Sequence, residues 1–147
     1  YPNPVTNILT IKSKNVEISK VEIYSILGEK IKEINSNFDS ITTDNLPNGV
    51  YLIKIYSEKG ELIEAHIYKN GQYNGLASYF DGLGNKMYEG NYVNGKRVGT
   101  WKFFEKNKVI KEVKASKFSK ELIKYEQRYT KEVSKTLEQM KQEKGGE

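Results

Sequence analysis

The stretch from residue 44 to residue 56, DNLPNGVYLIKIY, constrains the fold more than any other part of the chain. Pro47 fixes its own backbone φ near the value that turns require, and the Asn-Gly pair after it tolerates positive φ, so the chain is predicted to reverse here. Residues 50–56 are β-branched, aromatic or aliphatic, and Lys54 is their only charge. This run predicts a strand inside a sheet, with a partner strand on each side and a second layer over its apolar face.

Further short runs of the same kind lie on both sides of that strand. Tyr1-Pro2-Asn3-Pro4 cannot be helical, because proline fixes φ and biases the residue before it toward extended geometry. The runs recur at intervals of about 8–12 residues with turn residues between them, which predicts a small antiparallel β-sandwich over residues 1–69. The expected strands are residues 8–11, 21–26, 30–34, 40–43, 50–56 and 62–68.

Four motifs in residues 1–69 resemble, in order, the type A C-terminal sorting domain of the type IX secretion system. They are YPNPVTNILTI, VEIYSILGEKI, ITTDNLPNGVYLIKI and a closing strand that ends at Lys69. The resemblance implies an Ig-like sandwich that carries cargo across the outer membrane of Bacteroidetes-type bacteria. It also implies recognition by an outer-membrane shuttle and sortase, usually with removal of the domain and anchoring of the cargo at the surface. The motif positions are Pro2, Asn3, Pro4, Gly28, Leu46, Gly49, Tyr51 and Lys54.

Ordinary turn and core chemistry also accounts for these residue types: prolines begin an edge strand, Gly49 serves a turn and Tyr51 fills a core. Function would then lie in the assembled surface. In the family the domain normally ends the protein, whereas 78 of the 147 residues follow it here. Either the segment is not a cleavable signal, or its fold is reused for docking. The chain begins at Tyr1 without Met, so a processed product or a fragment is expected.

The second part of the chain, residues 68–113, contains an internal repeat. YKNGQYNGLASYF, from residue 68, aligns with YVNGKRVGTWKFF, from residue 92. Each Asn-Gly predicts a type I′ hairpin turn. The later glycine of each unit is expected to allow close backbone approach, while the aromatic pair packs on the next hairpin. The positions that define the repeat are Tyr68, Asn70, Gly71, Gly75, Tyr92, Asn94, Gly95, Gly99 and Trp101.

The pattern YEGNYVNGKRVGTWKFF resembles the bacterial variant of the MORN repeat, a β-hairpin module. The resemblance implies a module for contact with other molecules, mainly proteins or lipids, and no chemistry. Trp101, Phe103 and Phe104 are equally explained as hairpin core, because such hairpins need buried aromatic side chains. Lys96 and Arg97 in the hairpin loop are typical of a solvated turn rather than an anion site.

From residue 116 onward the apolar residues recur every three or four positions, with no Gly or Pro before Gly145. This spacing predicts an amphipathic helix, capped by Ser116 or Ser119 and ended by a pair of glycines. A helix of about 25 residues is about 37 Å long, more than two small hairpins cover, so part of its apolar stripe should meet another protein. Phe118, Leu122, Tyr125 and Tyr129 are expected nearest the hairpins, and Val133, Leu137 and Met140 at the interface.

The positive charge lies in the second half of the chain. Residues 1–69 carry a net charge of −1, residues 70–113 carry +3 and residues 114–147 carry +3. No RGG, zinc-finger or helix-turn-helix pattern accompanies these cations, and Glu is interspersed among them, so no nucleic-acid partner is expected. The expected partners are proteins of the outer-membrane secretion or surface-assembly machinery. For the helix, packing on the hairpins, contact with a second copy and indirect contact with an acidic membrane face all stay open.

No residues form a recognisable catalytic constellation. The chain has no Cys, and its one histidine, His66, lies in the middle of an expected strand, where a structural histidine is the common case. We therefore predict no catalytic, cofactor-binding or metal-binding residues, and no cofactor. The predicted class is a non-catalytic export or docking module, and the alternative is a periplasmic or cell-surface scaffold that reuses a sorting-domain fold. Either protein would be exported to the periplasm, outer membrane or cell surface.

The predicted fold class is mainly β. It comprises an Ig-like antiparallel sandwich at residues 1–69, MORN-type β-hairpin repeats at residues 70–113, and an amphipathic helix with a tail at residues 114–147. No run of apolar residues is long enough to cross a bilayer, and no leader-like segment stands at the start.

Overall fold

The computed structural model describes residues 8–9, 11, 17–42 and 46–145 of the chain. The predicted motif residues Pro2, Asn3 and Pro4 therefore lie outside the described residues, as does the second glycine of the expected helix end. Within the C-terminal helix the side chains of residues 129–134, 136 and 143–145 are not described, which includes those of Tyr129 and Val133.

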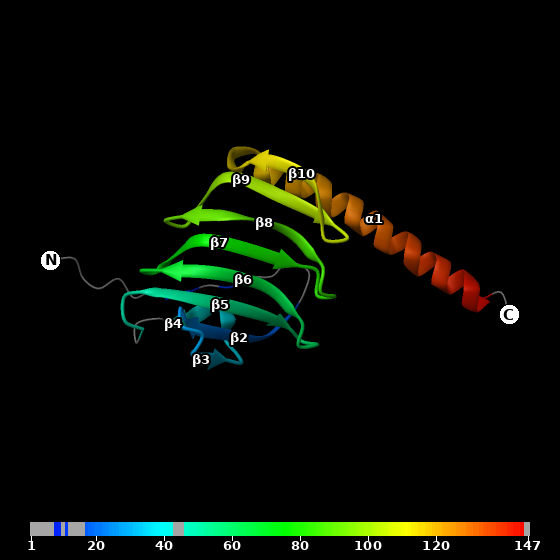
Figure 1. The fold of residues 1–147 in the computed structure, drawn as a ribbon. Helices are drawn as coiled ribbons and strands as arrows, with labels where there is room; N and C mark the ends of the chain where they lie inside the picture. The colour runs from blue at the N-terminus through cyan, green and yellow to red at the C-terminus, as the bar shows by residue number, and fades with distance from the viewer. Residues whose placement is uncertain (1–7, 10, 12–16, 43–45, 146–147) are drawn as a thin grey trace.

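Eight of the strands form one antiparallel sheet in the order β10-β9-β8-β7-β6-β5-β2-β3, and β1 and β4 form a separate two-stranded sheet (Figure 1). From β5 onward each strand pairs with the next along the chain. The strands are β1 Ile8–Leu9, β2 Ile18–Ser25, β3 Lys30–Ile34, β4 Ile41–Thr42, β5 Val50–Ser57, β6 Leu62–Lys69, β7 Gln72–Phe80, β8 Lys86–Val93, β9 Lys96–Glu105 and β10 Lys108–Lys114.

Strand β5 is the interior strand that its sequence predicts. It lies between β2 and β6, and its residues alternate between one buried and one half-buried face. Tyr51, Ile53 and Ile55 point to the buried face, and Lys54 points to the opposite one. Successive residues of a strand point to opposite faces, so this alternation in burial indicates a sheet with one covered face.

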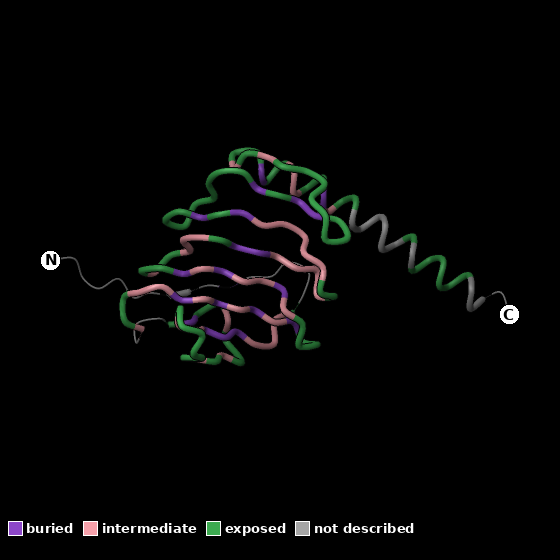
Figure 2. The backbone as a smooth tube through the Cα atoms, viewed as in Figure 1, coloured by how far each residue is buried: buried purple, intermediate pink, exposed green. Residues whose placement is uncertain are grey.

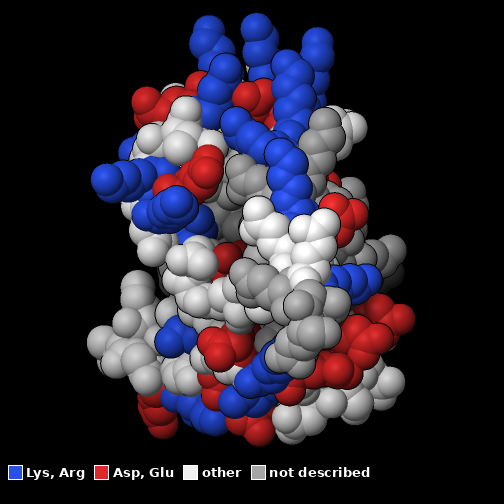
Figure 3. All heavy atoms as spheres, turned by 90° about the vertical axis from the view of Figure 1, so that its right-hand side faces the viewer, with Lys and Arg blue, Asp and Glu red and all other residues white. Residues whose placement is uncertain are grey.

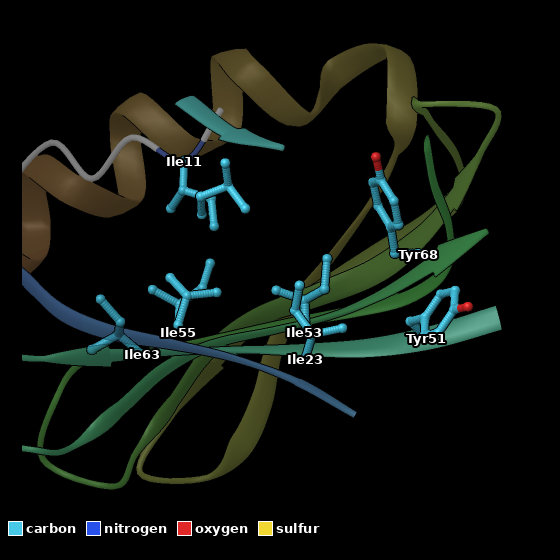
Figure 4. Close-up of a cluster of buried hydrophobic side chains, with 9 residues drawn as sticks. Ile11, Ile23, Tyr51, Ile53, Ile55, Ile63 and Tyr68 are labelled. Carbon is cyan, nitrogen blue, oxygen red and sulfur yellow. The ribbon is translucent and has the colours of Figure 1, made fainter. Parts of the chain in front are cut away.

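The N-terminal core lies between this sheet and the short strands β1 and β4. Figure 4 shows the side chains of β2, β5 and β6 pointing toward Ile11, on the other side of the core. The segment before β4 includes a 3-10 helix, η1 Phe38–Ser40, so Ser40 ends a helical turn instead of starting the predicted strand. The buried residues of this core are Ile11, Val21, Ile23, Ile41, Tyr51, Ile53, Ile55, Ile63 and Tyr68.

The C-terminal core lies on the same face of the sheet, over β7, β8 and β9. Cross-strand partners share a face, and the partners Ile53, His66, Ala77 and Gly90 connect the two cores across four strands. Tyr73 packs against both cores. The buried residues of this second core are Ala77, Tyr92, Trp101, Phe103, Phe118 and Tyr125.

The helix follows β10 through a 3-10 turn, η2 Ala115–Lys117, and runs as α1 Phe118–Gly145. Figure 1 shows its start behind β9 and β10 and its end projecting past the sheet. Figure 2 shows buried residues in its first turns and exposed residues further along, where its side chains are described. The predicted helix and its beginning near Ser116 are confirmed.

The structure confirms a mainly β fold with an antiparallel sheet and one C-terminal helix. One finding was not expected from the predicted division at residues 69 and 70. Strand β6 pairs with β7 through the turn at that division, so the same sheet runs from β3 to β10 without interruption.

Candidate interaction surfaces

The described sorting-motif residues around the central turn have structural contacts. The hydroxyl of buried Tyr51 donates a hydrogen bond to the carbonyl of Pro47 at 2.6 Å and so fixes the turn to the strand. Gly49 accepts a hydrogen bond from the backbone N–H of Asn70 at 3.3 Å. Leu46 is half-buried against the N-terminal core. These residues shape the turn and the core, as turn chemistry predicts.

Gly28 lies at the exposed tip of the β2–β3 hairpin. Its φ is +92°, and a Cβ atom there would meet nothing within 4 Å, so the glycine is required by backbone conformation and not by space. The two residues before it are both highly exposed apolar side chains: Ile26 is 74% exposed and Leu27 is 93% exposed. An apolar hairpin tip therefore stands free at the N-terminal end of the sheet.

Lys54 lies on the face of the sheet opposite the cores. Its ammonium group is 4.9 Å from the centre of the Tyr24 ring, and Lys20 lies 4.7 Å from the Tyr56 ring. In the strand register Lys54 stands between Glu22 on β2 and Ala65 on β6. Lysines lying over tyrosine rings thus cover the N-terminal half of this open face.

Glu22 is the buried acid at the centre of this open face, with 5% of its surface exposed. Its carboxylate accepts hydrogen bonds from the Tyr24 hydroxyl at 2.8 Å and from Lys30 Nζ at 3.0 Å. Burial alone would raise the pKa of Glu22. The hydrogen bonds that it accepts, together with a nearby lysine charge, outweigh burial and lower its pKa from 4.5 to about 2. The sequence did not predict this network, because its members come together only through the register of the strands.

The two Asn-Gly turns predicted in the repeat are confirmed, whereas neither Asn48 nor Gly49 has a positive φ. Asn70 and Gly71 have φ values of 49° and 87°, and Asn94 and Gly95 have values of 50° and 80°. Positive φ at both central residues is the mark of a type I′ turn, which suits the twist of the flanking strands. The first pair joins β6 to β7 and the second joins β8 to β9, so the repeat in the sequence corresponds to two hairpins of the sheet.

The second glycine of each repeat unit differs from its counterpart in the other unit. A Cβ at Gly75 would lie 3.0 Å from the Cβ of Ile67, so this glycine allows the expected close approach. A Cβ at Gly99 would meet nothing within 4 Å, and the expectation of close approach is wrong there; its φ of +68° is the reason for glycine. The tightest contact belongs to Gly90, where a Cβ would overlap carbon atoms of the Trp101 ring.

The aromatic pair of the second repeat unit spans the sheet. Neighbouring residues of a strand point to opposite faces, so Phe103 and Phe104 cannot both pack on one hairpin as expected. Phe103 stacks on Phe118 of α1 with ring centres 5.4 Å apart, and Phe104 lies on the other face beneath Lys86. Trp101 is fully buried in the C-terminal core, consistent with a structural role.

His66 is buried between the two cores, with 1% of its surface exposed. Its Nε2 donates a hydrogen bond to Glu64 Oε1 at 2.8 Å, and its ring stacks on Tyr73 at 4.0 Å. Its Nδ1 has no hydrogen-bond partner among the described residues. Burial raises the pKa of the neighbouring Tyr73 and Tyr79 above the usual range, so both rings stay protonated. The histidine is thus a core residue with one satisfied nitrogen.

The first turns of α1 are attached to the sheet by aromatic contacts. Phe118 is 1% exposed, and the Tyr125 hydroxyl donates a hydrogen bond to the Phe104 carbonyl at 2.6 Å. The guanidinium of Arg97 lies 4.2 Å from the centre of the Phe118 ring. Further along, Leu137 and Met140 are 54% and 55% exposed. The expected split of the helix into a docked and an undocked part therefore holds for every one of these described side chains.

The described residues contain no group of three or more His, Asp and Glu side chains that could hold a metal ion. No helix in the described part of the chain is both long enough and apolar enough to cross a membrane.

Comparison with known proteins bears on the N-terminal part, whose strands and core are now defined. Residues 1–69 match the family model of the secretion system C-terminal sorting domain. This domain of the type IX system indicates an exported protein that passes to the outer membrane or the cell surface. The match ends at the last residue of β6, so the family module contains all the strands that build the N-terminal core.

One curated relative, the ulvan lyase NLR42 of Nonlabens ulvanivorans, is 32% identical to this chain over 73 residues. The match covers 48% of this chain and 14% of the lyase, so the chain spans a small part of that protein's length. No solved structure matches the chain.

Proposed function

We propose that this protein is a non-catalytic secretion and docking module. In this proposal the outer-membrane machinery of the type IX system recognises the N-terminal part, and the hairpins and helix contact protein partners. The observation that carries the proposal is the family match over residues 1–69, which coincides with strands β1 to β6 and their core. The layer of β1 and β4 over the larger sheet supports an Ig-like sandwich arrangement for this part.

The exposed tip of the β2–β3 hairpin is the surface that we propose for recognition by the machinery. Tyr51 and Leu46 are used in the turn and the core, whereas Ile26 and Leu27 are almost free of contacts. Adjacent exposed apolar side chains form a small apolar patch that a partner can cover. The tyrosines and lysines of the open sheet face, near Lys54, lie on β2 and its neighbour β5 and enlarge this surface.

The proposed contact role of the second half rests on the repeated hairpins and on α1. The two type I′ turns and their 24-residue offset, from residue 70 to residue 94, support MORN-like hairpin units. Leu137 and Met140 lie exposed on the part of α1 that projects from the sheet (Figure 1). We propose that this part binds a protein of the surface-assembly machinery or a second copy of the chain.

The unbroken sheet favours the alternative function, a retained surface scaffold. Strand β6 is paired with β5 on one side and with β7 on the other. Cleavage after residue 69 and loss of the rest would leave the backbone groups of β6 unpaired along a new edge. A chain that keeps both halves together therefore suits a docking fold better than a removable signal.

A secretion assay tests the proposal. The whole chain is fused to the C-terminus of a periplasmic reporter in a host with a type IX system, and surface exposure is measured by added protease. We expect surface exposure that is lost with the double change Ile26→Asp and Leu27→Asp. The matched control is Leu83→Asp, because Leu83 is a 77% exposed residue of another hairpin turn. An intact reporter that stays in the periplasm contradicts the secretion role.

The mass of the exported product separates the two functions. A retained scaffold keeps the full mass of the fusion, whereas a cleaved signal loses the residues of the sorting segment. A pull-down measures whether the outer-membrane machinery captures the chain, with and without the Ile26 and Leu27 changes. It shows whether the chain is recognised even when it is not exported.

A further inference from the structure

The strongest unexplained feature of the surface is a set of cations along one edge of the sheet. In Figure 3, which views the molecule from the right-hand side of Figure 1, Lys and Arg gather at the top, where Figure 1 places β9 and β10. Residues 105–128 carry eight cations and four carboxylates, a net charge of +4 within a chain of net charge +5. We name these eight residues the cationic edge: Lys106, Lys108, Lys111, Lys114, Lys117, Lys120, Lys124 and Arg128.

Most cations of the cationic edge have no ion pair among the described residues. All eight side chains are exposed. Within the part of the chain that the structure describes, only Lys111 among them has an ion pair, at 3.7 Å to Glu121 of α1. By contrast, the lysines of the N-terminal open face are paired with Glu22 or lie over tyrosine rings. Eight exposed like charges repel one another, so a bound anion would relieve repulsion at this edge.

The helix and the edge strand present some of their cations on the same side. The ion pair between Lys111 and Glu121 marks the side of α1 that faces β10. At about 3.6 residues per turn, Lys124 and Arg128 of α1 lie within about 60° of Glu121 around the helix axis. In the strand register Lys108 and Lys111 share the face of Phe103, on which α1 packs, whereas Lys114 pairs with Thr100 and lies on the opposite face. Lys108 and Lys111 of β10 therefore lie on the same side as Lys124 and Arg128 of α1.

A set of point charges along one edge suits a linear polymer with repeated anionic groups. Seven of the eight cations are lysines, which bind anions as compact charges without the planar recognition that arginine provides. Exposed lysines gathered on one part of a surface attract polyanions, sulfated polysaccharides among them. We propose that the cationic edge binds an acidic polysaccharide, through the sulfate or carboxylate groups along its chain.

Two observations favour a polysaccharide over nucleic acid and over a lipid surface. The aromatic rings of this region, such as Trp101, Phe103 and Phe118, are buried and cannot stack on bases. The apolar side of the first turns of α1 packs on the sheet, so a membrane would gain little apolar contact from the helix.

Binding to heparin, a linear sulfated polysaccharide, tests the proposal with the whole chain. The test variant carries Lys108→Gln, Lys117→Gln and Lys124→Gln. The control variant carries Lys59→Gln, Lys69→Gln and Lys141→Gln, which remove the same charge from exposed positions outside the edge. We expect the test variant to bind heparin at least about tenfold more weakly and with a shallower salt dependence, and the control to change much less. Thermal melting of both variants establishes that they fold.

Four results would overturn the proposal: no heparin binding by the unmodified chain at moderate salt, no loss of affinity in the test variant, equal losses in both variants, or tighter binding to a competitor. The competitors are a DNA duplex and vesicles of phosphatidylglycerol. The vesicles test the exposed Val109 and Ile110 of β10, which are 46% and 40% exposed. The secretion assay uses variants at the other end of the sheet, so failure of this proposal leaves that function untouched.

Discussion

The two cores share one face of one sheet but are built from different materials. The N-terminal core is mainly aliphatic, and the short strands β1 and β4 cover it. The C-terminal core is mainly aromatic, and the first turns of a single helix cover it. Each aromatic side chain buries a large surface, so a few rings can form a core that would otherwise need several more aliphatic side chains. A narrow cover such as Phe118, Leu122 and Tyr125 therefore suffices when the residues beneath it are large.

The largest effect is expected for Trp101→Ala, which removes the central ring of the aromatic core. Trp101 is fully buried and contacts Tyr92 and Phe118 at ring-centre distances of 5.4 and 4.7 Å. We expect a loss of about 4 kcal/mol in the free energy of unfolding. Chemical denaturation measures this loss, and a value below that of Ile53→Ala would contradict the comparison between the cores.

The matching change in the aliphatic core is Ile53→Ala. Ile53 is fully buried between Ile23 on β2 and His66 on β6 in the strand register. Its truncation should cost about 3 kcal/mol, because several neighbouring aliphatic side chains can move into part of the space. Denaturation should show this smaller loss with an unchanged slope against denaturant. A change in the slope would indicate that the two cores unfold separately.

A third change tests the close contact beneath the tryptophan. Gly90→Ala adds a methyl group where the Trp101 ring already lies, so the ring must move. We expect a loss of about 2 kcal/mol by overpacking. Adding Trp101→Leu to the Gly90→Ala chain should make room for the methyl group. If the two changes are instead additive, steric contact with the ring is not the cause.

The N-terminal half should also respond to acid through Glu22. Its pKa is lower in the folded chain, about 2, than the usual 4.5, so its contribution to stability is complete above pH 4.5 and is lost as the pH falls toward 2. Melting temperatures between pH 6 and pH 2 should fall more steeply for the unmodified chain than for Glu22→Gln. The control Glu105→Gln, at an exposed position, should leave the steepness unchanged. Equal pH dependence in Glu22→Gln would show that this network is not the origin.

The smallest effect is expected for Arg97→Gln. The guanidinium lies over Phe118 at 4.2 Å, but the side chain is exposed to water. Loss of the cation–π contact should cost about 0.5–1 kcal/mol. The more specific readout is hydrogen exchange in the first turns of α1, which should become faster while exchange in β5 stays the same. Faster exchange in both places would mean that the contact supports the whole fold and not the helix.

Local patterns predicted much of this structure. The alternation in residues 50–56 and the Asn-Gly pairs of the repeat gave correct strands and turns, because both signals depend on neighbouring residues. The Asn70-Gly71 turn also contained the information that the sheet continues, since a two-residue hairpin pairs the strands on its two sides. The division of the chain at residue 69 overlooked that consequence.

Contacts between distant residues were beyond reach of the sequence. Glu22 meets Lys30 and a tyrosine of β5 only through strand register, and Gly90 lies beneath Trp101 for the same reason. The cations of β10 and α1 were visible as a basic half of the chain, but the arrangement of some of them on one side depends on how the helix docks. For the candidate surfaces, the sequence predicted which residue types are present but not which of them lie together in the fold.

The serial pairing of strands β5 to β10 affects how the chain acquires its structure. Each of these strands pairs with its immediate successor, so the contacts close short loops and lose little chain entropy. In contrast, the pairing of β2 with β5 and of β1 with β4 must bring together segments separated by about 30 residues of chain. We expect the hairpins to form first when the unfolded chain folds, and the N-terminal core to close later onto this preformed sheet.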